Sequence, residues 1–357
     1  MKKIYPCLEI DLSKIKNNAK VVNKLCSEVN IDIVGVSKVF LARRPIVKEF
    51  LEAGIKIIGD SRISNLKKLQ GMNCEKMLLR IPMESDLEDV VLYSDYSLNS
   101  EIDTIINIDK VSEKLGKIHK IILMVDLGDL REGILENDVL NVVDKVINLK
   151  NVKLAGIGTN LTCYGGVIPD KDNLGRLLEI KSLINEKYNT KIQIISGGNS
   201  SSLYMVINKT IPFGINQLRI GEGIVLGRET SFGQVIPGCF NDAVKLKGEI
   251  IEIKEKPSTP KGNLGTDAFG NKPVFKDKGI MKRAILAIGR QDILINGLKP
   301  DDYSVEIIGA SSDHLILDVT KCENSYKVGD ILSFNLSYGA LLASMTSPYV
   351  KKYYEKR

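Results

Sequence analysis

The sequence contains no tryptophan and only two histidines, His119 and His314. Because histidine is the commonest protein ligand for transition metals, this scarcity excludes a histidine-rich metal centre. The six cysteines lie far apart and form no CxxC pair, which excludes the usual zinc-binding spacing and a disulfide framework. Any demanding chemistry therefore requires a lysine, a tyrosine, a carboxylate or an organic cofactor.

Long apolar runs and blocks of like charge are also missing. No window reaches the roughly 18 consecutive apolar residues of a membrane-spanning helix. The first segment, MKKIYPCLEIDLSK, has proline and acids where a signal peptide has its apolar stretch. The net charge of +6 comes from 50 basic and 44 acidic residues spread along the chain, which does not indicate nucleic-acid binding. We expect a cytoplasmic protein that binds neither a membrane nor nucleic acid.

Over the first two thirds of the chain, short apolar runs alternate with longer amphipathic segments. Their apolar residues recur at three- and four-residue steps in the longer segments, as in helices packed on a sheet. Eight strands are predicted, over residues 32–38, 55–61, 76–82, 96–100, 120–129, 153–162, 192–198 and 217–223. Eight strands that alternate with helices predict an α/β fold class, with an N-terminal (β/α)8 barrel of the TIM type over residues 1–232.

From residue 233 onward the pattern changes to alternating apolar and polar residues, broken by Gly, Pro and Asp. This alternation is typical of antiparallel strands with one buried face. It predicts a C-terminal all-β domain over residues 233–357. Within it, the Gly/Pro-rich segment 257–275 is predicted to be a loop, of a length that is often functional in compact domains.

Polar residues follow the predicted barrel strands at their carboxyl ends, where barrel enzymes carry their active sites. Lys38 ends the first strand, where burial would favour a neutral amine that forms a Schiff base with an aldehyde. The turn SGGNSSSLYM (196–205) follows the seventh strand and opens a helix, and the first amides of a helix bind phosphate well. A reactive lysine and a phosphate-binding turn together predict pyridoxal 5'-phosphate as the cofactor.

The order of several motifs resembles the alanine racemase superfamily, the fold-type III pyridoxal phosphate enzymes, and most closely its ornithine racemase branch. VGVSKV is similar to the family's cofactor-lysine segment, which implies Lys38. MVDLGDLREG (124–133) resembles the segment whose arginine reaches the cofactor's phenolic oxygen and the substrate carboxylate, which implies Arg131. GIGTNLTCYGG (156–166) resembles the segment that supports the cofactor ring, with Asn160 where alanine racemases have histidine.

Three further segments extend the resemblance. SGGNSSS implies that Ser200 binds the phosphate. NLSYGALL resembles the family's tyrosine-containing strand, which implies that Tyr338 lies on a strand and donates to the phosphate. LRIGEGIVLG (218–227) supplies the loop after the eighth strand, where barrels also bind phosphate, and it implies that Arg219 faces the pyridine nitrogen, with the backbone of Gly221 and Glu222 also binding the cofactor. An arginine can only donate there, so the nitrogen stays unprotonated. That arrangement suits removal and return of a proton with little transamination.

Two positions depart from the family pattern. Ala42 stands where alanine racemases have a tyrosine that contacts the phosphate, and Arg290 stands where they have the second catalytic base, a tyrosine from the partner subunit. Racemisation needs an acid–base group on each face of the substrate carbanion. We expect the second base on the C-terminal domain, with His314 and Asp313 as the main candidates and Asp292 as a third.

The resemblance also implies a homodimer in which the C-terminal domain completes the partner's active site. Ser312 belongs to GASSDH, which resembles a segment that binds the substrate carboxylate, and Asp267 in the 257–275 loop is expected to pair with a terminal ammonium. Substrate contacts are thus expected from Arg131, Arg290, Ser312 and Asp267.

The function implied is racemisation of ornithine. A racemase of broader specificity for basic amino acids and an alanine racemase are the alternatives. A non-catalytic carrier of the cofactor is less favoured because such carriers lack the β domain, and a decarboxylase is less favoured because of Arg219.

Overall fold

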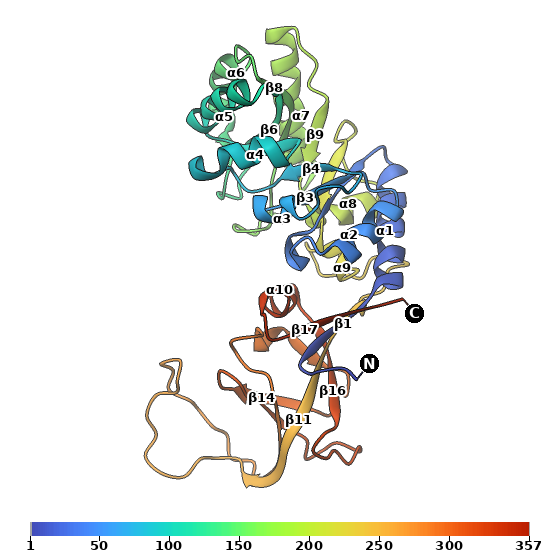
Figure 1. Cartoon of the computed structure of the whole chain (residues 1–357), viewed down its shortest axis with the longest axis vertical. Helices are drawn as coiled ribbons and strands as arrows, with labels where there is room; N and C mark the ends of the chain where they lie inside the picture. The colour runs from blue at the N-terminus through green and yellow to red at the C-terminus, as the bar shows by residue number, and fades with distance from the viewer. Residues whose placement is uncertain (1, 357) are drawn as a thin grey trace. The chain divides into compact units, whose positions relative to one another are not determined.

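The computed structural model describes residues 2–356, which divide into two compact units. One unit is Leu12–Ala243, and the other joins the residues before Leu12 to those from Val244 onward. Figure 1 shows both units and labels many of their helices and strands. None of the helices within residues 2–356 is long and apolar enough to cross a membrane.

The Leu12–Ala243 unit is a barrel of eight parallel strands. The sheet closes because β5 pairs with β6 in addition to β4. Around the barrel the strands follow the order β2, β3, β4, β5, β6, β8, β9, β10 and return to β2. Their bounds are β2 Asp32–Val36, β3 Ile57–Asp60, β4 Glu75–Leu78, β5 Tyr96–Asn99, β6 His119–Asp126, β8 Val152–Thr159, β9 Ile194–Gly197 and β10 Gln217–Ile220, with the short β7 (Ile134–Leu135) beside β6.

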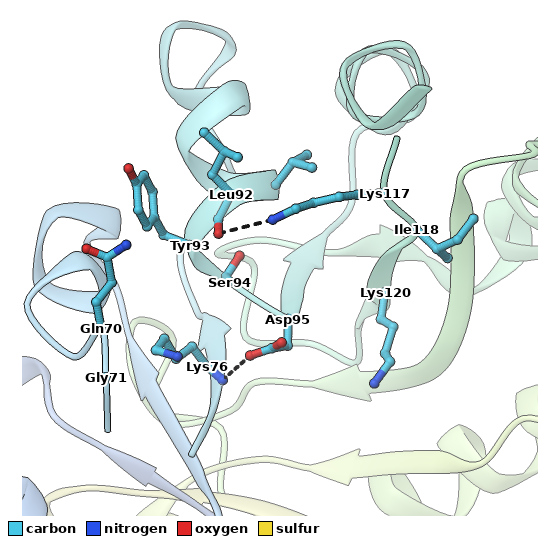
Figure 2. Close-up of a pocket in the computed structure, with 11 residues that line it drawn as sticks. Gln70, Gly71, Lys76, Leu92, Tyr93, Ser94, Asp95, Lys117, Ile118 and Lys120 are labelled. Atoms are coloured by element: carbon cyan, nitrogen blue, oxygen red, sulfur yellow. Dashed lines mark hydrogen bonds between the residues drawn. The ribbon is translucent and has the colours of Figure 1, made fainter. Parts of the chain in front are cut away.

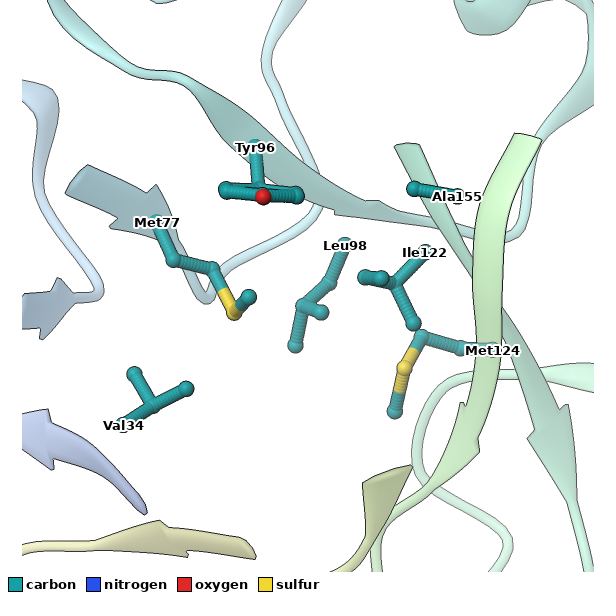
Figure 3. Close-up of a cluster of buried hydrophobic side chains, with 7 residues drawn as sticks. All are labelled: Val34, Met77, Tyr96, Leu98, Ile122, Met124 and Ala155. Atoms are coloured by element: carbon teal, nitrogen blue, oxygen red, sulfur yellow. The ribbon is translucent and has the colours of Figure 1, made fainter. Parts of the chain in front are cut away.

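Apolar side chains from five barrel strands pack against one another. The group consists of Val34, Met77, Tyr96, Leu98, Ile122, Met124 and Ala155. Figure 3 shows these side chains pointing toward one another from β2, β4, β5, β6 and β8. Strands buried on both faces need near-continuous apolar runs, which explains why they were recognisable in the sequence.

Helices connect the barrel strands. Their amphipathic sequences place one apolar face on the sheet, as in α5, where Ile105 and Ile108 are buried. The α-helices of this unit are α1 Leu12–Ser27, α2 Arg44–Glu52, α3 Ile63–Lys67, α4 Leu87–Tyr93, α5 Ile102–Leu115, α6 Val139–Val146, α7 Lys171–Tyr188, α8 Leu203–Ile207 and α9 Glu222–Val225. Short 3-10 turns are η1 Lys38–Phe40, η2 Glu84–Asp86, η3 Glu136–Asp138 and η4 Ser200–Ser202.

The second unit is built on a mainly antiparallel sheet in the order β13, β16, β11, β12, β15, β14. The strand β1 pairs antiparallel with β11 and parallel with β17. The bounds are β1 Cys7–Asp11, β11 Val244–Pro257, β12 Ile280–Leu286, β13 Leu298–Pro300, β14 Glu306–Ala310, β15 Leu315–Asp318, β16 Ile331–Leu336 and β17 Lys351–Glu355, with η5 Ile295–Gly297 and one helix, α10 Tyr338–Thr346.

The predicted architecture, a (β/α)8 barrel followed by a β domain, is confirmed. The division of the chain differs from residues 1–232 and 233–357 in two places. Residues 7–11 belong to the β domain because β1 pairs with β11 and β17 there. Residues 233–243 remain with the barrel, where Asn18 of α1 donates to the Phe240 carbonyl (2.7 Å) and accepts from its amide (2.7 Å).

Candidate active site

Lys38 lies directly after β2, as the first residue of the 3-10 turn η1. The expectation that it ends the strand and is buried there is wrong, because β2 ends at Val36 and Lys38 is exposed. The Ser37 amide donates to the Gly59 carbonyl of β3 (2.8 Å) as the last hydrogen bond of the β2–β3 ladder, and the chain then turns into η1. Lys38 therefore lies at the carboxyl ends of the barrel strands, where enzymes with this barrel fold carry their active sites.

The loops after β9 and β10 meet beside this lysine. A Cβ added to Gly221 would lie 3.0 Å from Cβ of Val36, so a larger residue would push against the end of β2. The amide of Gly223 donates to Oγ of Ser200 (3.1 Å), which joins the two loops. Burial raises the pKa of the neighbouring Glu222, and the nearby positive charges of Arg228 and Lys38 oppose that effect. Ser200, Gly221 and Glu222 thus lie on adjoining loops at one end of the barrel, whereas Tyr338 belongs to the other unit.

Arg219 is buried within the barrel, with only 4% of its surface exposed. Its guanidinium donates to Oγ of Ser196 (2.5 Å) and to the Thr159 carbonyl (2.7 Å). Burial lowers the pKa of Arg219 to about 10, which leaves it charged at neutral pH. The Arg219 guanidinium, held between strands β8, β9 and β10, is thus a fixed hydrogen-bond donor for a ligand at the carboxyl end of the barrel.

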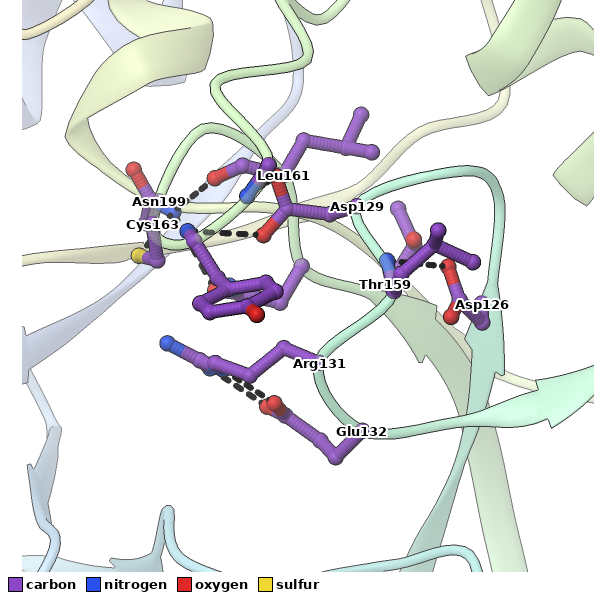
Figure 4. Close-up of polar contacts among 12 residues, drawn as sticks. Asp126, Asp129, Arg131, Glu132, Thr159, Leu161, Cys163 and Asn199 are labelled. Atoms are coloured by element: carbon purple, nitrogen blue, oxygen red, sulfur yellow. Dashed lines mark hydrogen bonds and ion pairs between the residues drawn. The ribbon is translucent and has the colours of Figure 1, made fainter.

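Arg131 is exposed, and its guanidinium forms two hydrogen bonds with the carboxylate of Glu132. Glu132 raises the pKa of Arg131 above its usual range, and Cys163 adds to that effect. Figure 4 shows Arg131 and Glu132 paired near Cys163 and Asn199. Glu132 raises the pKa of Arg219 and Arg131 lowers it. The two predicted arginines are therefore close enough to affect each other electrostatically.

The loops that carry these side chains are joined to each other. Asp129 is buried and accepts the amides of Tyr164 (3.1 Å) and Gly165 (3.0 Å) in the loop after β8. Asn199, after β9, donates to Oδ1 of Asn160 (3.1 Å) and to the Leu161 carbonyl (3.0 Å). Figure 4 shows these contacts linking the loops after β6, β8 and β9.

Three buried polar atoms at the ends of β8 and β9 have no hydrogen-bond partner within residues 2–356: Thr159 Oγ1, Asn160 Nδ2 and Ser201 Oγ. A buried donor without a partner costs free energy, so such atoms mark a place where a ligand would supply hydrogen bonds. A ring that carries a hydroxyl and a phosphate has the acceptors that these groups lack. The residues present therefore fit pyridoxal phosphate.

In the β domain, the segment after β12 packs on the turn between β14 and β15. A Cβ at Gly289 would lie 2.2 Å from the Ser312 carbonyl oxygen. Arg290 donates through Nε to the Ala310 carbonyl (3.0 Å), and its guanidinium lies 4.5 Å from the ring centroid of Phe269. Residues 258–279 form no helix or strand, which confirms the predicted loop.

Asp267 lies in this loop, and its carboxylate is already used locally. It accepts the amides of Phe269 (2.9 Å) and Asn271 (2.8 Å), and these bonds lower its pKa. The positive charge of Arg290 acts in the same direction. Hydrogen bonds within its own loop therefore orient the Asp267 carboxylate.

Ser312, Asp313 and His314 are exposed at the tip of the β14–β15 turn. The Asp313 carboxylate accepts from Nε2 of Gln291 (2.6 Å) and from Oγ of Ser312 (2.7 Å). His314 Nδ1 lies 3.4 Å from Oγ of Ser311. Five predicted residues, Asp267, Arg290, Ser312, Asp313 and His314, thus form one group within the β domain.

Two further predicted residues of this domain lie elsewhere in it. Tyr338 was expected on a strand, but β16 ends at Leu336 and Tyr338 is the first residue of α10, because Ser337 caps that helix by accepting the amide of Ala340 (3.3 Å). Asp292 is buried and accepts from Oγ of Ser347 (2.5 Å), which gives it a structural partner.

A pocket of about 530 Å³ lies at the amino ends of β4, β5 and β6, the opposite ends of the strands from Lys38. Figure 2 shows its lining, with Lys117 donating to the Leu92 carbonyl (3.5 Å) and Asp95 accepting from the Lys76 amide (2.7 Å). None of the predicted site residues lines this pocket. The candidate site is therefore defined by the loops at the carboxyl ends, and not by this pocket.

Several site residues were not recognised in the sequence: Asp129, Glu132, Cys163 and Asn199. Of these four, only Glu132 could have been noticed in the sequence, because it is an acid directly beside the predicted Arg131. The other three act through contacts between loops that are distant in sequence.

Comparisons with known proteins show the family of this chain. The model of the family "Alanine racemase, N-terminal domain" matches residues 10–229. Over 98% of this chain and 99% of the relative, the sequence is 50% identical to the ornithine racemase of Acetoanaerobium sticklandii. Over 99% of both chains it is 44% identical to the lysine racemase of Thermotoga maritima.

Among solved structures, the alanine racemase of Bartonella henselae with covalently bound pyridoxal phosphate has the same fold. The TM-score is 0.77 at 16% identity, over 99% of this chain and 100% of that one. With the barrel matched by the family model and both domains matched by the full-length relatives, the chain belongs to the alanine racemase family.

Proposed function

We propose that this protein is a pyridoxal phosphate-dependent amino-acid racemase that interconverts L- and D-ornithine. The observation that carries the proposal is the 50% identity to an ornithine racemase over nearly the whole of both chains. Lys38 at the carboxyl end of β2 and the unpaired polar atoms at the carboxyl ends of β8 and β9 support the cofactor. When bound, the cofactor supplies an electron sink that stabilises the negative charge left at Cα after proton removal.

The barrel residues would hold the cofactor and one end of the substrate. Lys38 carries the amine that bonds the cofactor and exchanges the α-proton on one face. Arg219 donates to the pyridine nitrogen, and Asn160 uses its unpaired Nδ2 on the cofactor ring. Arg131, fixed by Glu132, binds the substrate carboxylate.

The phosphate would be bound by groups from both domains. Ser200 and the backbone of Gly221 and Glu222 lie on adjoining loops of the barrel, which supports their joint use. Tyr338, in the β domain, is assigned to the same phosphate.

The second face of the substrate requires its own acid–base group, which we place on the β domain of the partner copy. We assign it to His314, with Asp313 as its partner in the same turn, and assign Ser312, Arg290 and Asp267 to substrate binding. These residues lie in one group on the domain, which supports their joint use in one site. The protein would then act as a homodimer, with each β domain completing the site of the partner's barrel.

A substrate panel tests this function. The purified protein with pyridoxal phosphate is incubated with L-ornithine, L-lysine and L-alanine in deuterium oxide, and the products are separated by chiral chromatography. We expect D-ornithine with deuterium at Cα, and no release of carbon dioxide. Loss of Lys38 (Lys38→Ala) abolishes the reaction, whereas the exposed Lys48→Ala control retains it.

A broader specificity for basic amino acids is the second candidate, because the lysine racemase is 44% identical over the full length. Equal rates with ornithine and lysine would establish it. Turnover of alanine alone would refute both assignments, and cofactor binding without turnover of any amino acid would indicate a carrier.

A further inference from the structure

The turn that carries Lys38 has an unusual backbone. Leu41 and Ala42 both have left-handed conformations, with φ of 54° and 52°. Residues other than glycine adopt this conformation at a cost in free energy, so two in succession persist only where the surroundings hold them. Within the turn the amide of Ala42 donates to the Ser37 carbonyl (3.3 Å), which closes residues 37–42 into a compact unit, called here the Lys38 turn.

Before Lys38, the turn is bound to a buried carboxylate. Oγ of Ser37 donates to Oδ2 of Asp60 (2.6 Å), and Asp60 has no exposed surface. The second oxygen of Asp60 accepts from Nδ2 of Asn65 (3.0 Å) and from the amide of Arg62 (2.9 Å). This carboxylate is therefore fully engaged, and hydrogen bonds to an ionised group are stronger than those between neutral groups.

After Lys38, the same group of residues reaches the turn again. The ammonium of Lys68 donates to Oδ1 of Asn65 (2.7 Å) and to the carbonyl of Leu41 (3.3 Å). Ser37, Asp60, Asn65 and Lys68 thus form one chain of hydrogen bonds, the Asp60 network, which contacts the turn on both sides of Lys38.

We propose that the Asp60 network is a positioning device for Lys38, in which Asp60 and Lys68 fix the turn so that the lysine amine meets the cofactor. This inference depends on the proposed cofactor chemistry of Lys38. Asp60 and Lys68 are positioning residues: they act through Ser37 and Leu41. Pre-organisation of the amine reduces the entropy lost when it combines with the cofactor aldehyde.

The chain offers a matched pair of lysines for the test. Lys68 is exposed, so its replacement opens no cavity, and the adjacent Lys67 pairs with Asp89 on another surface of the helix. Lys68→Met removes the network's contact with Leu41, Lys67→Met removes a surface ion pair, and Lys68→Arg retains a donor. All three variants are made in the full-length protein.

Three measurements are made on each variant: the dissociation constant of pyridoxal phosphate, the rate of borohydride trapping at Lys38 followed by mass spectrometry, and the thermal midpoint. We expect Lys68→Met to bind the cofactor about tenfold more weakly and to be trapped more slowly. Its thermal midpoint should match that of Lys67→Met. Lys68→Arg should recover most of the affinity.

Equal cofactor affinity and trapping in Lys68→Met and Lys67→Met would overturn the proposal. Hydrogen exchange at the Ala42 amide tests it without the cofactor, and we expect faster exchange in Lys68→Met only. If the unaltered protein bound no cofactor, the proposed function would fail. In that case unchanged exchange at Ala42 would refute the network's effect on the turn, and faster exchange would support it.

Discussion

Two arginines at the end of the barrel differ in how they are held. Arg219 is buried, and strands β8 and β9 accept its hydrogen bonds. Arg131 is exposed and lies on a loop, where Glu132 is its ion-pair partner. A donor fixed by strands suits a cofactor that stays in place, whereas a loop arginine suits a substrate that enters and leaves at each turnover.

Replacing Glu132 should therefore affect substrate more than cofactor. We expect Glu132→Gln to raise KM for ornithine by about tenfold, because Arg131 loses a charged partner that orients it. Cofactor affinity should not change. Steady-state kinetics and a pyridoxal phosphate titration measure the two effects. Glu136→Gln, which removes a surface pair with Arg176, is the control. An unchanged KM would show that Arg131 needs no orientation by Glu132.

The assignment of His314 makes a second prediction at this scale. If His314 is the acid–base group on one face and Lys38 on the other, His314→Ala should lower the rate of racemisation at least about a hundredfold. One enantiomer should still exchange its α-proton through Lys38. Solvent deuterium incorporation into L- and D-ornithine, measured separately, tests this. Undiminished inversion would transfer the role of second base away from His314.

Lys38 and the two arginines were recognisable in the sequence because each follows a buried strand with a motif of its own. The exposure of Lys38 was not, because the chain leaves β2 at Ser37, whose partners Gly59 and Asp60 are distant in sequence. Asp129 and Asn199 were missed for the same reason, since their partners lie on other loops.

Within the elements, strand β6 begins with a buried histidine. His119 is 2% exposed, and its Nε2 lies 2.8 Å from Oγ of Ser97 in β5. Burial lowers its pKa from 6.5 to about 4. Between these values the unfolded chain binds a proton that the folded protein does not, so folding stability falls as the pH drops from 6.5 to 4.

We expect this histidine to remove about 3 kcal/mol of stability across that range of pH. His119→Gln should therefore reduce the difference in urea denaturation midpoint between pH 7 and pH 4.5. His314 is the only other histidine and is exposed, so His314→Gln is the control. A pH dependence that is the same in all three proteins would contradict a buried, neutral His119.

The contact between Gly289 and the β14–β15 turn gives a further prediction. A Cβ at position 289 would overlap the Ser312 carbonyl, so Gly289→Ala must displace the turn that carries Asp313 and His314. We expect a loss of about 1–3 kcal/mol, seen as a lower thermal midpoint by calorimetry. Gly309→Ala adds a Cβ with no atom within 4 Å and serves as the control. Equal midpoints would mean that the turn tolerates the displacement.

The elements themselves were largely predictable. The eight barrel strands were found because strands covered on both faces consist of apolar runs, and the helices because of their three- and four-residue periodicity. The start of α10 at Tyr338 was missed, since NLSYGALL continues the apolar pattern of β16, and only the Ser337 cap separates the two elements.

For the molecule as a whole, the proposed shared site predicts complementation between two inactive variants. Lys38→Ala supplies an intact β domain, and His314→Ala supplies an intact barrel. Dimers formed at random from an equal mixture should recover about a quarter of the normal sites, because half of the dimers carry one intact site of two. Subunits are mixed after mild dissociation, and racemisation is measured. Recovery of no activity, with mixed dimers verified by mass spectrometry, would contradict a site built from two chains.

The pairing of β1 with β11 and β17 makes the barrel an insertion within the β domain. During synthesis β1 leaves the ribosome before the barrel does, and its partner strands follow only after the barrel is complete. The barrel is a continuous stretch of chain and can fold first. Until β11 and β17 are synthesised, the backbone N–H and C=O groups of β1 have no strand to pair with. The β domain is thus expected to complete its folding after the barrel, and a fragment cut after the barrel would leave this early strand without either of its neighbours.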